Sequence, residues 1–244
     1  MRSEYKEKDM VRSCVIVPAL DAEATLGKVI DDVRGALQAP VLVVDDGSRD
    51  ATARVARAHG AILVAHERNR GKGAALRSAL REAAGRGFDV AVSVDADGQH
   101  PAASARVVLD ASDDPRALVL GVRDLARDGA PRSNRFGNAV SNFFLSRFAS
   151  RSMRDTQCGL RRYPIAATLA LGARADGFAF EGEIILRALA AGLPLVEVPI
   201  GVLYPVASRQ PSHFRRVADP VRIIGTVVRT VLDLRMRDGL ARAP

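Results

Sequence analysis

The chain has 244 residues, of which 48% are hydrophobic and 26% are charged, and its formal net charge is +8. This size and composition suit one large or two small globular domains and exclude global disorder. No stretch reaches the ~18 uncharged apolar residues of a membrane-spanning helix. The charged N-terminal residues lack the apolar core of a signal peptide, so we expect a cytoplasmic protein. Two cysteines and four histidines, scattered along the chain, argue against a disulfide framework and a zinc site.

The first hundred residues predict strands that alternate with helices. Apolar runs predict strands at 13–18, 41–44, 61–65 and 90–94, and helical periodicity predicts helices at 21–37, 50–59 and 72–86. Elements alternating at this spacing predict a mostly parallel sheet with helices on both faces. Ligands of such sheets bind beyond the carboxyl ends of the strands.

The pattern is looser after residue 101. We expect a helix at 103–109, a strand at 118–121, a polar loop at 123–135, helices at 136–148 and 181–191, and a strand at 195–199. Residues 220–234 form an amphipathic pattern, which predicts a C-terminal helix. The last 42 residues carry eight arginines and three aspartates, so this end of the chain is basic.

Acidic residues follow two of the predicted strands. Asp45 and Asp46 end the second strand, and Asp95 and Asp97 end the fourth. Two carboxylates this close repel unless a cation lies between them. Oxygen ligands suit Mg²⁺ or Mn²⁺, and Gln99 or His100 could complete the site. Taken alone, each pair also fits a solvated turn or a helix cap.

A glycine-rich stretch, NRGKG, stands at 69–73 before a predicted helix and includes Lys72. Glycines let backbone N–H groups approach a ligand, and the start of a helix favours anions, although a plain loop also fits this stretch. Arginine forks match phosphate oxygens. The candidate phosphate-binding arginines are Arg123, Arg132, Arg135, Arg161, Arg162 and Arg209.

Together these stretches resemble the family 2 glycosyltransferases of the GT-A fold, in particular the dolichol- or polyprenyl-phosphate mannosyl- and glucosyltransferases. The resemblance covers roughly residues 13–205. The matching pieces are VIVPALDAE (15–23), VVDDGSRDAT (43–52), NRGKGAALRSAL (69–80), VDADGQHP (94–101), DTQCGLRRY (155–163), FAFEGEIILRA (178–188) and GLPLVEVPI (192–200).

The resemblance implies a nucleotide-sugar donor, a Mg²⁺ or Mn²⁺ cofactor, and roles for individual residues. Asp95, Asp97 and Gln99 would bind the metal, and Asp155, Glu183 and Asp97 would act in catalysis. The implied donor-binding residues are Pro18, Asp21, Glu23, Asp46, Lys72, Asp95 and Ala96. The acceptor phosphate would contact Arg123, Arg132, Arg161 and Arg209.

The resemblance also divides the chain. It implies an N-terminal tail (1–12), a nucleotide-sugar-binding half (13–101), an acceptor-binding half of the same GT-A domain (102–205) and a basic amphipathic C-terminal segment (206–244). This chain has SRQPSHFRR at 208–216, where that branch has an acceptor-contacting GxSK element.

The resulting hypothesis is an inverting, metal-dependent transfer of a hexose from a GDP- or UDP-sugar to a polyprenyl phosphate. The alternative keeps the donor and has a hydroxyl acceptor on a lipid or polyene, which would need Asp155 or Glu183 as general base. The basic C-terminal segment predicts peripheral contact with anionic lipid at the cytoplasmic face. Packing of 220–234 on the domain or in a homodimer remains the other interpretation. A non-catalytic nucleic-acid-binding protein is a remote third reading, because the acidic pairs would have no purpose there.

Overall fold

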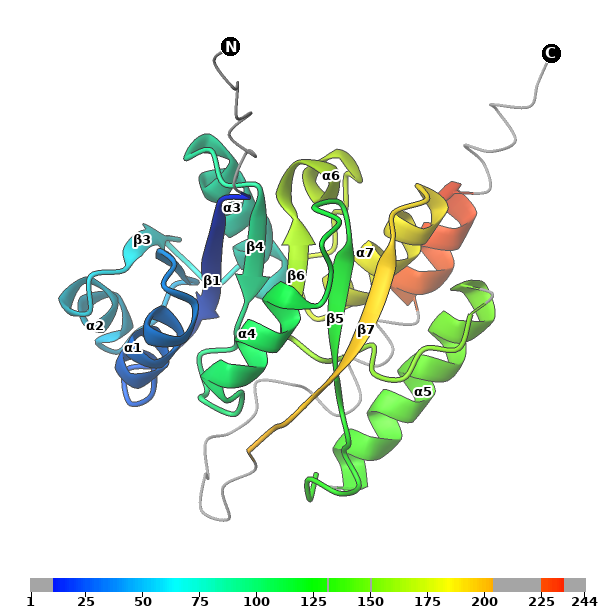
Figure 1. Cartoon of the computed structure of the whole chain (residues 1–244), viewed down its shortest axis with the longest axis horizontal. Coiled ribbons are helices and arrows are strands. Elements are labelled where there is room, and N and C mark those ends of the chain that lie inside the picture. Colours follow the sequence, from blue (N-terminus) through cyan, green and yellow to red (C-terminus); the bar gives the residue numbers. More distant parts are fainter. Residues whose placement is uncertain (1–10, 131, 150, 204–224, 235–244) are drawn as a thin grey trace, which may run out of the picture.

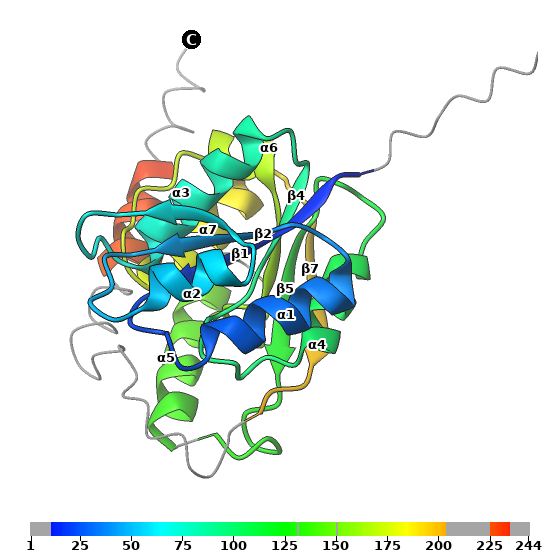
Figure 2. The ribbon, with the colours of Figure 1, turned by 90° about the vertical axis from the view of Figure 1, so that its left-hand side faces the viewer.

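The structure is a computed structural model that describes residues 11–130, 132–149, 151–203 and 225–234. One seven-stranded sheet runs through the molecule with helices on both faces (Figures 1 and 2). Its strands are β1 (Ser13–Ala19), β2 (Val41–Asp45), β3 (Ile62–Ala65), β4 (Val90–Ser93), β5 (Leu118–Arg123), β6 (Arg161–Pro164) and β7 (Leu195–Ile200). No helix in the described ranges combines the length and the apolar character needed to cross a bilayer.

The strand order is β3-β2-β1-β4-β6-β5-β7. All neighbouring pairs are parallel except those of β6, which runs antiparallel to β4 and to β5. Strands from both halves of the chain therefore belong to one continuous sheet. The predicted sheet, mostly parallel and flanked by helices, is confirmed.

Seven helices of the described chain carry labels. They are α1 (Leu26–Leu37), α2 (Thr52–Ala58), α3 (Lys72–Gly85), α4 (Ala102–Asp110), α5 (Arg132–Ala149), α6 (Ile165–Ala170) and α7 (Ala179–Ala190). Side chains of α1, α2 and α4 join one apolar core, and those of α3, α6 and α7 join the other. Val15 and Val17 of β1 enter the first core, while Cys14 and Ile16 enter the second. Because both faces are covered, the central strands carry runs of consecutive apolar residues rather than apolar residues at alternate positions.

The structure adds two elements that the sequence pattern did not predict, β6 and α6. Strand β6 contains Arg161 and Arg162, so its sequence is polar, yet both side chains are buried. Helix α5 begins at Arg132, earlier than the predicted residue 136, and α1 begins at Leu26 instead of 21. At the start of α1, Asp21 has a φ of 48° and belongs to the preceding loop.

Residues 225–234 form a helix beside α7 (Figure 1). Val227 is buried in a small cluster with Leu145 of α5, whereas Val228 and Leu232 are 44% and 54% exposed. Arg187 of α7 pairs with Asp233 of this helix at 3.0 Å. The first residues of the predicted helix, 220–224, lie outside the described residues. Within 225–234, some apolar side chains are buried against the protein and others are exposed to solvent.

Candidate active site

The carboxyl ends of β1, β2 and β4 lie together at one edge of the sheet, because β1 pairs in parallel with both other strands. This places the loops after Ala19, Asp45 and Ser93 side by side. The predicted donor-binding positions lie on these loops, apart from Pro18, which lies within β1, and Lys72, which begins α3. The sheet topology therefore gathers residues that are far apart in sequence.

Carboxylates from the loop after β1 hold the loop after β2. Asp21 accepts the Arg49 N–H at 2.8 Å, and Glu23 accepts the Ala51 N–H at 2.9 Å. Both acidic side chains belong to exposed residues at the sheet edge. Their predicted contact with the base and ribose of a donor stays a prediction, as does that of Pro18.

Asp46 anchors the turn that precedes α3. Its carboxylate accepts the backbone N–H groups of Arg70 at 3.0 Å and Gly71 at 2.7 Å, and it lies 2.6 Å from Nδ1 of His66. Nε2 of His66 lies 3.0 Å from the Ser78 hydroxyl of α3. Asp46 is buried, and its carboxylate is engaged by this turn; its predicted contact with the nucleoside stays a prediction.

Lys72 is the first residue of α3, and its ammonium group is the positive charge at the centre of the site. Its Nζ lies 2.7 Å from Asp95 Oδ1 and 3.0 Å from Glu181 Oε1 of α7. Burial alone would lower the pKa of Lys72, but the two carboxylates outweigh it and raise that pKa. Burial would likewise raise the pKa of Asp95, yet Lys72 and His100 hold it well below its usual range. The ion pair is therefore charged throughout the neutral pH range.

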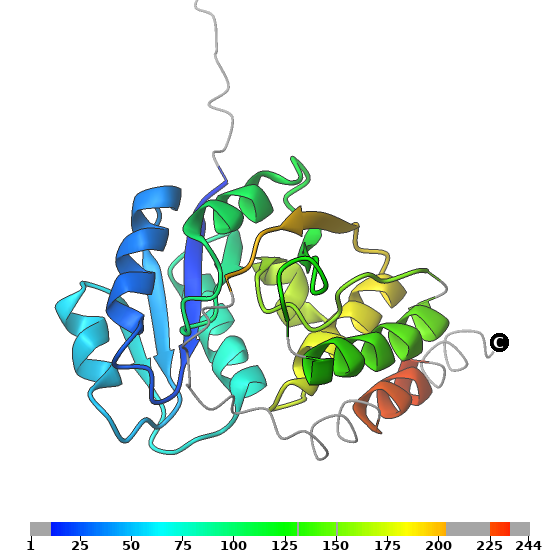
Figure 3. The ribbon, with the colours of Figure 1, turned by 90° about the horizontal axis from the view of Figure 1, so that it is seen from below.

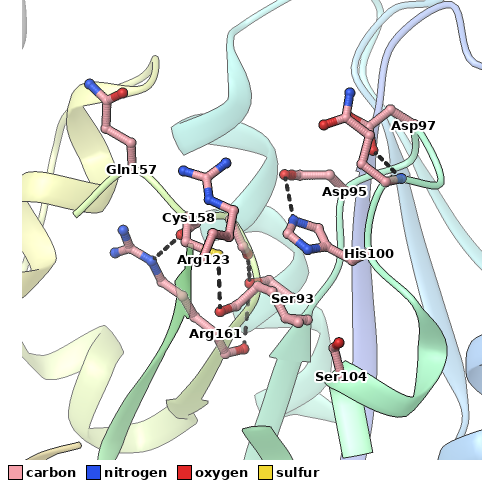
Figure 4. Close-up of polar contacts among 12 residues, drawn as sticks. Ser93, Asp95, Asp97, His100, Ser104, Arg123, Gln157, Cys158 and Arg161 are labelled. Atoms are coloured by element: carbon pink, nitrogen blue, oxygen red, sulfur yellow. Dashed lines mark hydrogen bonds and ion pairs between the residues drawn. The ribbon is translucent and has the colours of Figure 1, made fainter. Parts of the chain in front are cut away.

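Gly159 leaves room for this ion pair because glycine has no side chain. A Cβ on Gly159 would lie 2.3 Å from Asp95 Oδ2 and 2.7 Å from Lys72 Nζ. Gly159 is held by its carbonyl, which accepts the Ser93 hydroxyl of β4 at 2.5 Å. His100 also approaches Asp95, with Nε2 at 3.8 Å from Oδ2 (Figure 4). The glycine is thus part of the shape of the site.

Asp97 lies beyond Asp95 on the same turn (Figure 4). Its Oδ1 accepts the Gln99 N–H at 2.9 Å, and the Ala96 carbonyl accepts the Thr25 hydroxyl at 2.6 Å. Desolvation and then the Asp95 carboxylate raise the pKa of Asp97. Of the two Asp97 oxygens, Oδ2 has no hydrogen-bond partner from the described residues.

The donor set at this turn fits a hard divalent cation. No three His, Cys, Asp or Glu side chains gather as a metal cluster anywhere in the described ranges. Asp97 nevertheless offers a carboxylate oxygen to solvent, with Asp95 and Gln99 beside it. Mg²⁺ typically takes one or two protein carboxylates and completes its coordination with waters and substrate phosphates, so a partial set of oxygen ligands suits it.

Asp155 and Arg123 form a second ion pair at the end of β5. Asp155 is fully buried, and its oxygens accept the Arg123 Nε at 2.7 Å, Nη2 at 3.0 Å and backbone N–H at 3.1 Å. Asp155 was predicted to act directly on the sugar. In the structure Asp155 holds the Arg123 guanidinium in place. Its predicted action on the sugar stays a prediction, as does the predicted contact of Arg123 with a phosphate.

Glu183 is held by groups of the protein itself. Its Oε2 accepts the N–H groups of Arg174 at 2.9 Å and Ala175 at 2.8 Å, and Oε1 accepts Nε of Arg187 at 2.7 Å. Its predicted place beside the sugar stays a prediction. The acidic residue of α7 that reaches the site is Glu181, two positions earlier. Residues two apart on a helix point to different sides, so only one of them can face Lys72.

Arg161 requires a correction. Its side chain is fully buried, and it donates at 2.8 Å to the carbonyls of Thr156, Cys158 and Glu181 (Figure 4). A guanidinium engaged in this way has no access to a phosphate, so its role is structural. Arg132 is exposed at the start of α5, and Arg209 lies outside the described residues.

Three contributors to the site were missed by the sequence reasoning. Glu181 and Gly159 stand inside quoted motifs, FAFEGEIILRA and DTQCGLRRY, but the motifs do not say which side chain faces Lys72 or where a Cβ would collide. His66 belongs to none of the quoted motifs, although it begins the polar stretch 66–69 that follows the third predicted strand. The sequence indicates its role only through its position directly after a predicted strand. That position places it at the carboxyl edge of the sheet, where ligands bind.

The fold and this edge define a class of protein. A mostly parallel sheet with acidic turns at its carboxyl edge matches the glycosyltransferases of the GT-A type. Glucosyl-3-phosphoglycerate synthase from Mycobacterium tuberculosis, solved with Mn²⁺, UDP and glucosyl-3-phosphoglycerate, superposes with a TM-score of 0.69. At 21% identity over 91% of this chain and 80% of that one, the likeness shows the fold.

Residues 14–167 match the protein family described as glycosyl transferase family 2, and the chain belongs to that family. Dolichyl-phosphate beta-glucosyltransferase from Drosophila melanogaster is 31% identical over 76% of this chain and 65% of the relative. Polyprenol monophosphomannose synthase from Mycolicibacterium smegmatis is 30% identical over 78% of this chain and 76% of the relative. The protein is therefore a glycosyltransferase, as the motifs predicted.

Proposed function

We propose that this glycosyltransferase transfers a hexose from a nucleoside-diphosphate sugar to a polyprenyl phosphate, with inversion at the anomeric carbon and with Mg²⁺ or Mn²⁺ as cofactor. The relatives named for dolichyl and polyprenol phosphates support the acceptor class. The structural neighbour that holds Mn²⁺ and UDP supports the donor class and the metal. Asp97, with Asp95 and Gln99, is the proposed metal-binding group.

One observation favours a phosphate over a hydroxyl acceptor. A hydroxyl must lose its proton during transfer, whereas a phosphate is already anionic and needs no base. The two carboxylates predicted as bases, Asp155 and Glu183, are both buried and bonded to arginines. Asp95 is paired with Lys72. The geometry therefore supports an acceptor that brings its own negative charge.

In this proposal the residues of the chain bind and orient charged groups. Lys72 places its ammonium at the turn that carries Asp95, where it is available to a diphosphate oxygen. Asp155 fixes the Arg123 guanidinium at the carboxyl end of β5, two strands along the sheet from β4, where it would meet a phosphate. A bound metal would supply Lewis-acid stabilisation of the leaving diphosphate.

The acceptor is tested by incubating the purified chain with radiolabelled GDP- and UDP-hexoses and two lipids of equal chain length, a polyprenyl phosphate and the free polyprenol. We expect transfer to the phosphate and none to the alcohol. The product should release its sugar in mild acid, since it would be a glycosyl phosphodiester. Product stereochemistry, read from the anomeric proton coupling, should be inverted relative to the donor.

The matched control is Glu67→Gln, because Glu67 is an exposed acid near the same sheet edge that has no part in the proposed mechanism. It should transfer at the wild-type rate. Transfer to the alcohol at a comparable rate would favour the hydroxyl-acceptor alternative. Absence of transfer from every nucleotide sugar to either lipid would contradict the proposal as a whole.

Metal binding is tested by thermal unfolding. Mn²⁺ with the nucleoside diphosphate of the active donor, at about 100 times the dissociation constant, should stabilise the chain by about 2.7 kcal/mol. For a chain of this size that corresponds to roughly 5–10 °C in Tm. Asp97→Asn removes the exposed carboxylate and should lose most of the Mn²⁺-dependent part of the shift. An equal Mn²⁺-dependent shift in Tm for wild type and variant would show that Asp97 does not bind the metal.

A further inference from the structure

Helix α5 exposes two large aromatic side chains to solvent. Phe136 is 73% and Phe143 68% exposed, the largest exposed fractions among the big apolar residues of the described chain. They are seven residues apart, which places them on the same side of the helix two turns apart. The Phe143 ring packs edge to face on Phe144, with ring centroids 5.5 Å apart, so it is supported in its exposed position.

The same side of α5 is basic. Between 132 and 149 the chain has three arginines and no Asp or Glu. At about 100° per residue, the exposed residues of α5 other than Asn134 share an arc of about 120° around the two phenylalanines. We call this surface the α5 face, and it consists of Arg132, Arg135, Phe136, Ala139, Phe143 and Arg147. The opposite side of the helix carries the buried residues Asn138, Ser141 and Leu145.

Aromatic rings flanked by arginines complement the boundary between lipid headgroups and acyl chains. The rings leave water for the acyl region, and the guanidinium groups meet anionic headgroups. A second copy of this chain is a poorer occupant, because a two-fold interface centred on the face would bring its arginines together. The charge and the exposed rings together select an anionic lipid surface.

The α5 face is connected to the candidate active site through the inner side of its helix. Asn142 donates to the Arg154 carbonyl at 2.7 Å and accepts the Thr156 N–H at 2.9 Å, and the hydroxyls of Ser141 and Thr156 lie 2.8 Å apart. The segment so held contains Asp155, which orients Arg123. A surface on which α5 rests would therefore lie close to the Arg123 end of the site.

We propose that the α5 face docks the enzyme on an anionic bilayer, and that this docking presents a membrane-embedded polyprenyl phosphate to the site. The second part rests on the proposed function; the docking itself does not. The sequence had predicted the C-terminal segment as the membrane contact. In the 225–234 helix, which lies beside α5 (Figure 3), Val228 and Leu232 offer a smaller exposed apolar surface.

Vesicle flotation of the full-length protein separates these surfaces. The vesicles are phosphatidylcholine with or without phosphatidylglycerol, and the variants are Phe136→Ser/Phe143→Ser, Val228→Ser/Leu232→Ser, and the control Val107→Ser, which alters an exposed apolar residue on α4. We expect wild type to float with anionic vesicles only, and less at about 500 mM salt than at about 50 mM. The α5 variant should partition at least about tenfold less, because the burial of one ring alone accounts for a change of that size. The other two variants should match wild type.

Melting temperatures of the variants should equal that of wild type, because the substituted side chains lie on the surface. Wild-type flotation by the α5 variant, or a loss in the Val228→Ser/Leu232→Ser variant alone, would overturn the proposal. So would a change from dimer to monomer caused by the α5 substitutions in lipid-free solution. That result would assign the face to a second copy.

A transfer assay separates docking from the proposed function. With polyprenyl phosphate in anionic vesicles, the α5 variant should be about tenfold slower than wild type. With a short, water-soluble isoprenyl phosphate it should match wild type. Equal loss with both acceptors would overturn the docking proposal. If wild type transfers to neither acceptor while the flotation difference holds, the proposed acceptor is wrong and the docking surface stands.

Discussion

Replacing Gly159 by alanine is expected to lower kcat/KM by about 100- to 1,000-fold while leaving the protein folded. The new Cβ would lie 2.3 Å from Asp95 Oδ2 and 2.7 Å from Lys72 Nζ, so these two groups must move apart. Displacing charged groups by about 1 Å costs about 100-fold or more when they act in a reaction. Since both colliding atoms end mobile side chains, the free energy of unfolding should change by less than about 1 kcal/mol.

Steady-state kinetics and thermal unfolding of the same preparation test this expectation. Gly35→Ala is the matched control, because nothing lies within 4 Å of a Cβ at that position in α1. It should keep full activity and gain up to about 1 kcal/mol of stability from better helix propensity. Wild-type turnover by Gly159→Ala would show that the Lys72–Asp95 geometry does not matter for the reaction.

Arg161→Met is expected to lower the free energy of unfolding by about 3–5 kcal/mol, the usual cost of breaking a buried charged network. The substitution leaves the carbonyls of Thr156, Cys158 and Glu181 without their donor in a site that excludes water. For a chain of this size the loss corresponds to roughly 10 °C in Tm. Arg161→Lys keeps the positive charge but lacks the planar guanidinium that donates to several carbonyls. Its free energy of unfolding should therefore lie between those of wild type and Arg161→Met.

Urea unfolding monitored by circular dichroism measures this loss. Arg57→Met, which alters an exposed arginine of α2, should stay within about 0.5 kcal/mol of wild type. The original prediction, that Arg161 clamps a phosphate, leads to the opposite pattern. It requires an unchanged free energy of unfolding together with a raised KM for a phosphate-bearing substrate.

The fold was predictable where local pattern and burial agree. The strands β1, β2 and β4 contain consecutive apolar residues because helices cover both faces, and the predicted boundaries are correct to within about two residues. Strand β6 was not predictable in this way. Its residues, RRYP, have no apolar pattern. The burial of Arg161 depends on two carbonyls of the loop that precedes β6 and on the Glu181 carbonyl of α7.

The motifs predicted which segments form the site. They did not predict which side chains of those segments contact one another. The acidic turn with Asp95 and Asp97 does end a central strand, as its apolar run indicated. The choice between Glu181 and Glu183 depends on how α7 is rotated about its axis. That rotation is set by the packing of α7 on the sheet, where Ile184 and Ile185 enter the core, and no short motif contains this information.

By itself the sequence determined the class of chemistry: which strands end in acids, where glycines open the backbone, and that the chain is a family 2 glycosyltransferase. Those properties are local, because strand formation and turn composition depend on neighbouring residues. Only the tertiary structure decided which carboxylates remain available, since Asp155 and Glu183 are engaged by arginines that the fold brings to them. It also decided which helix presents exposed phenylalanines, because exposure is a property of what the rest of the chain leaves uncovered.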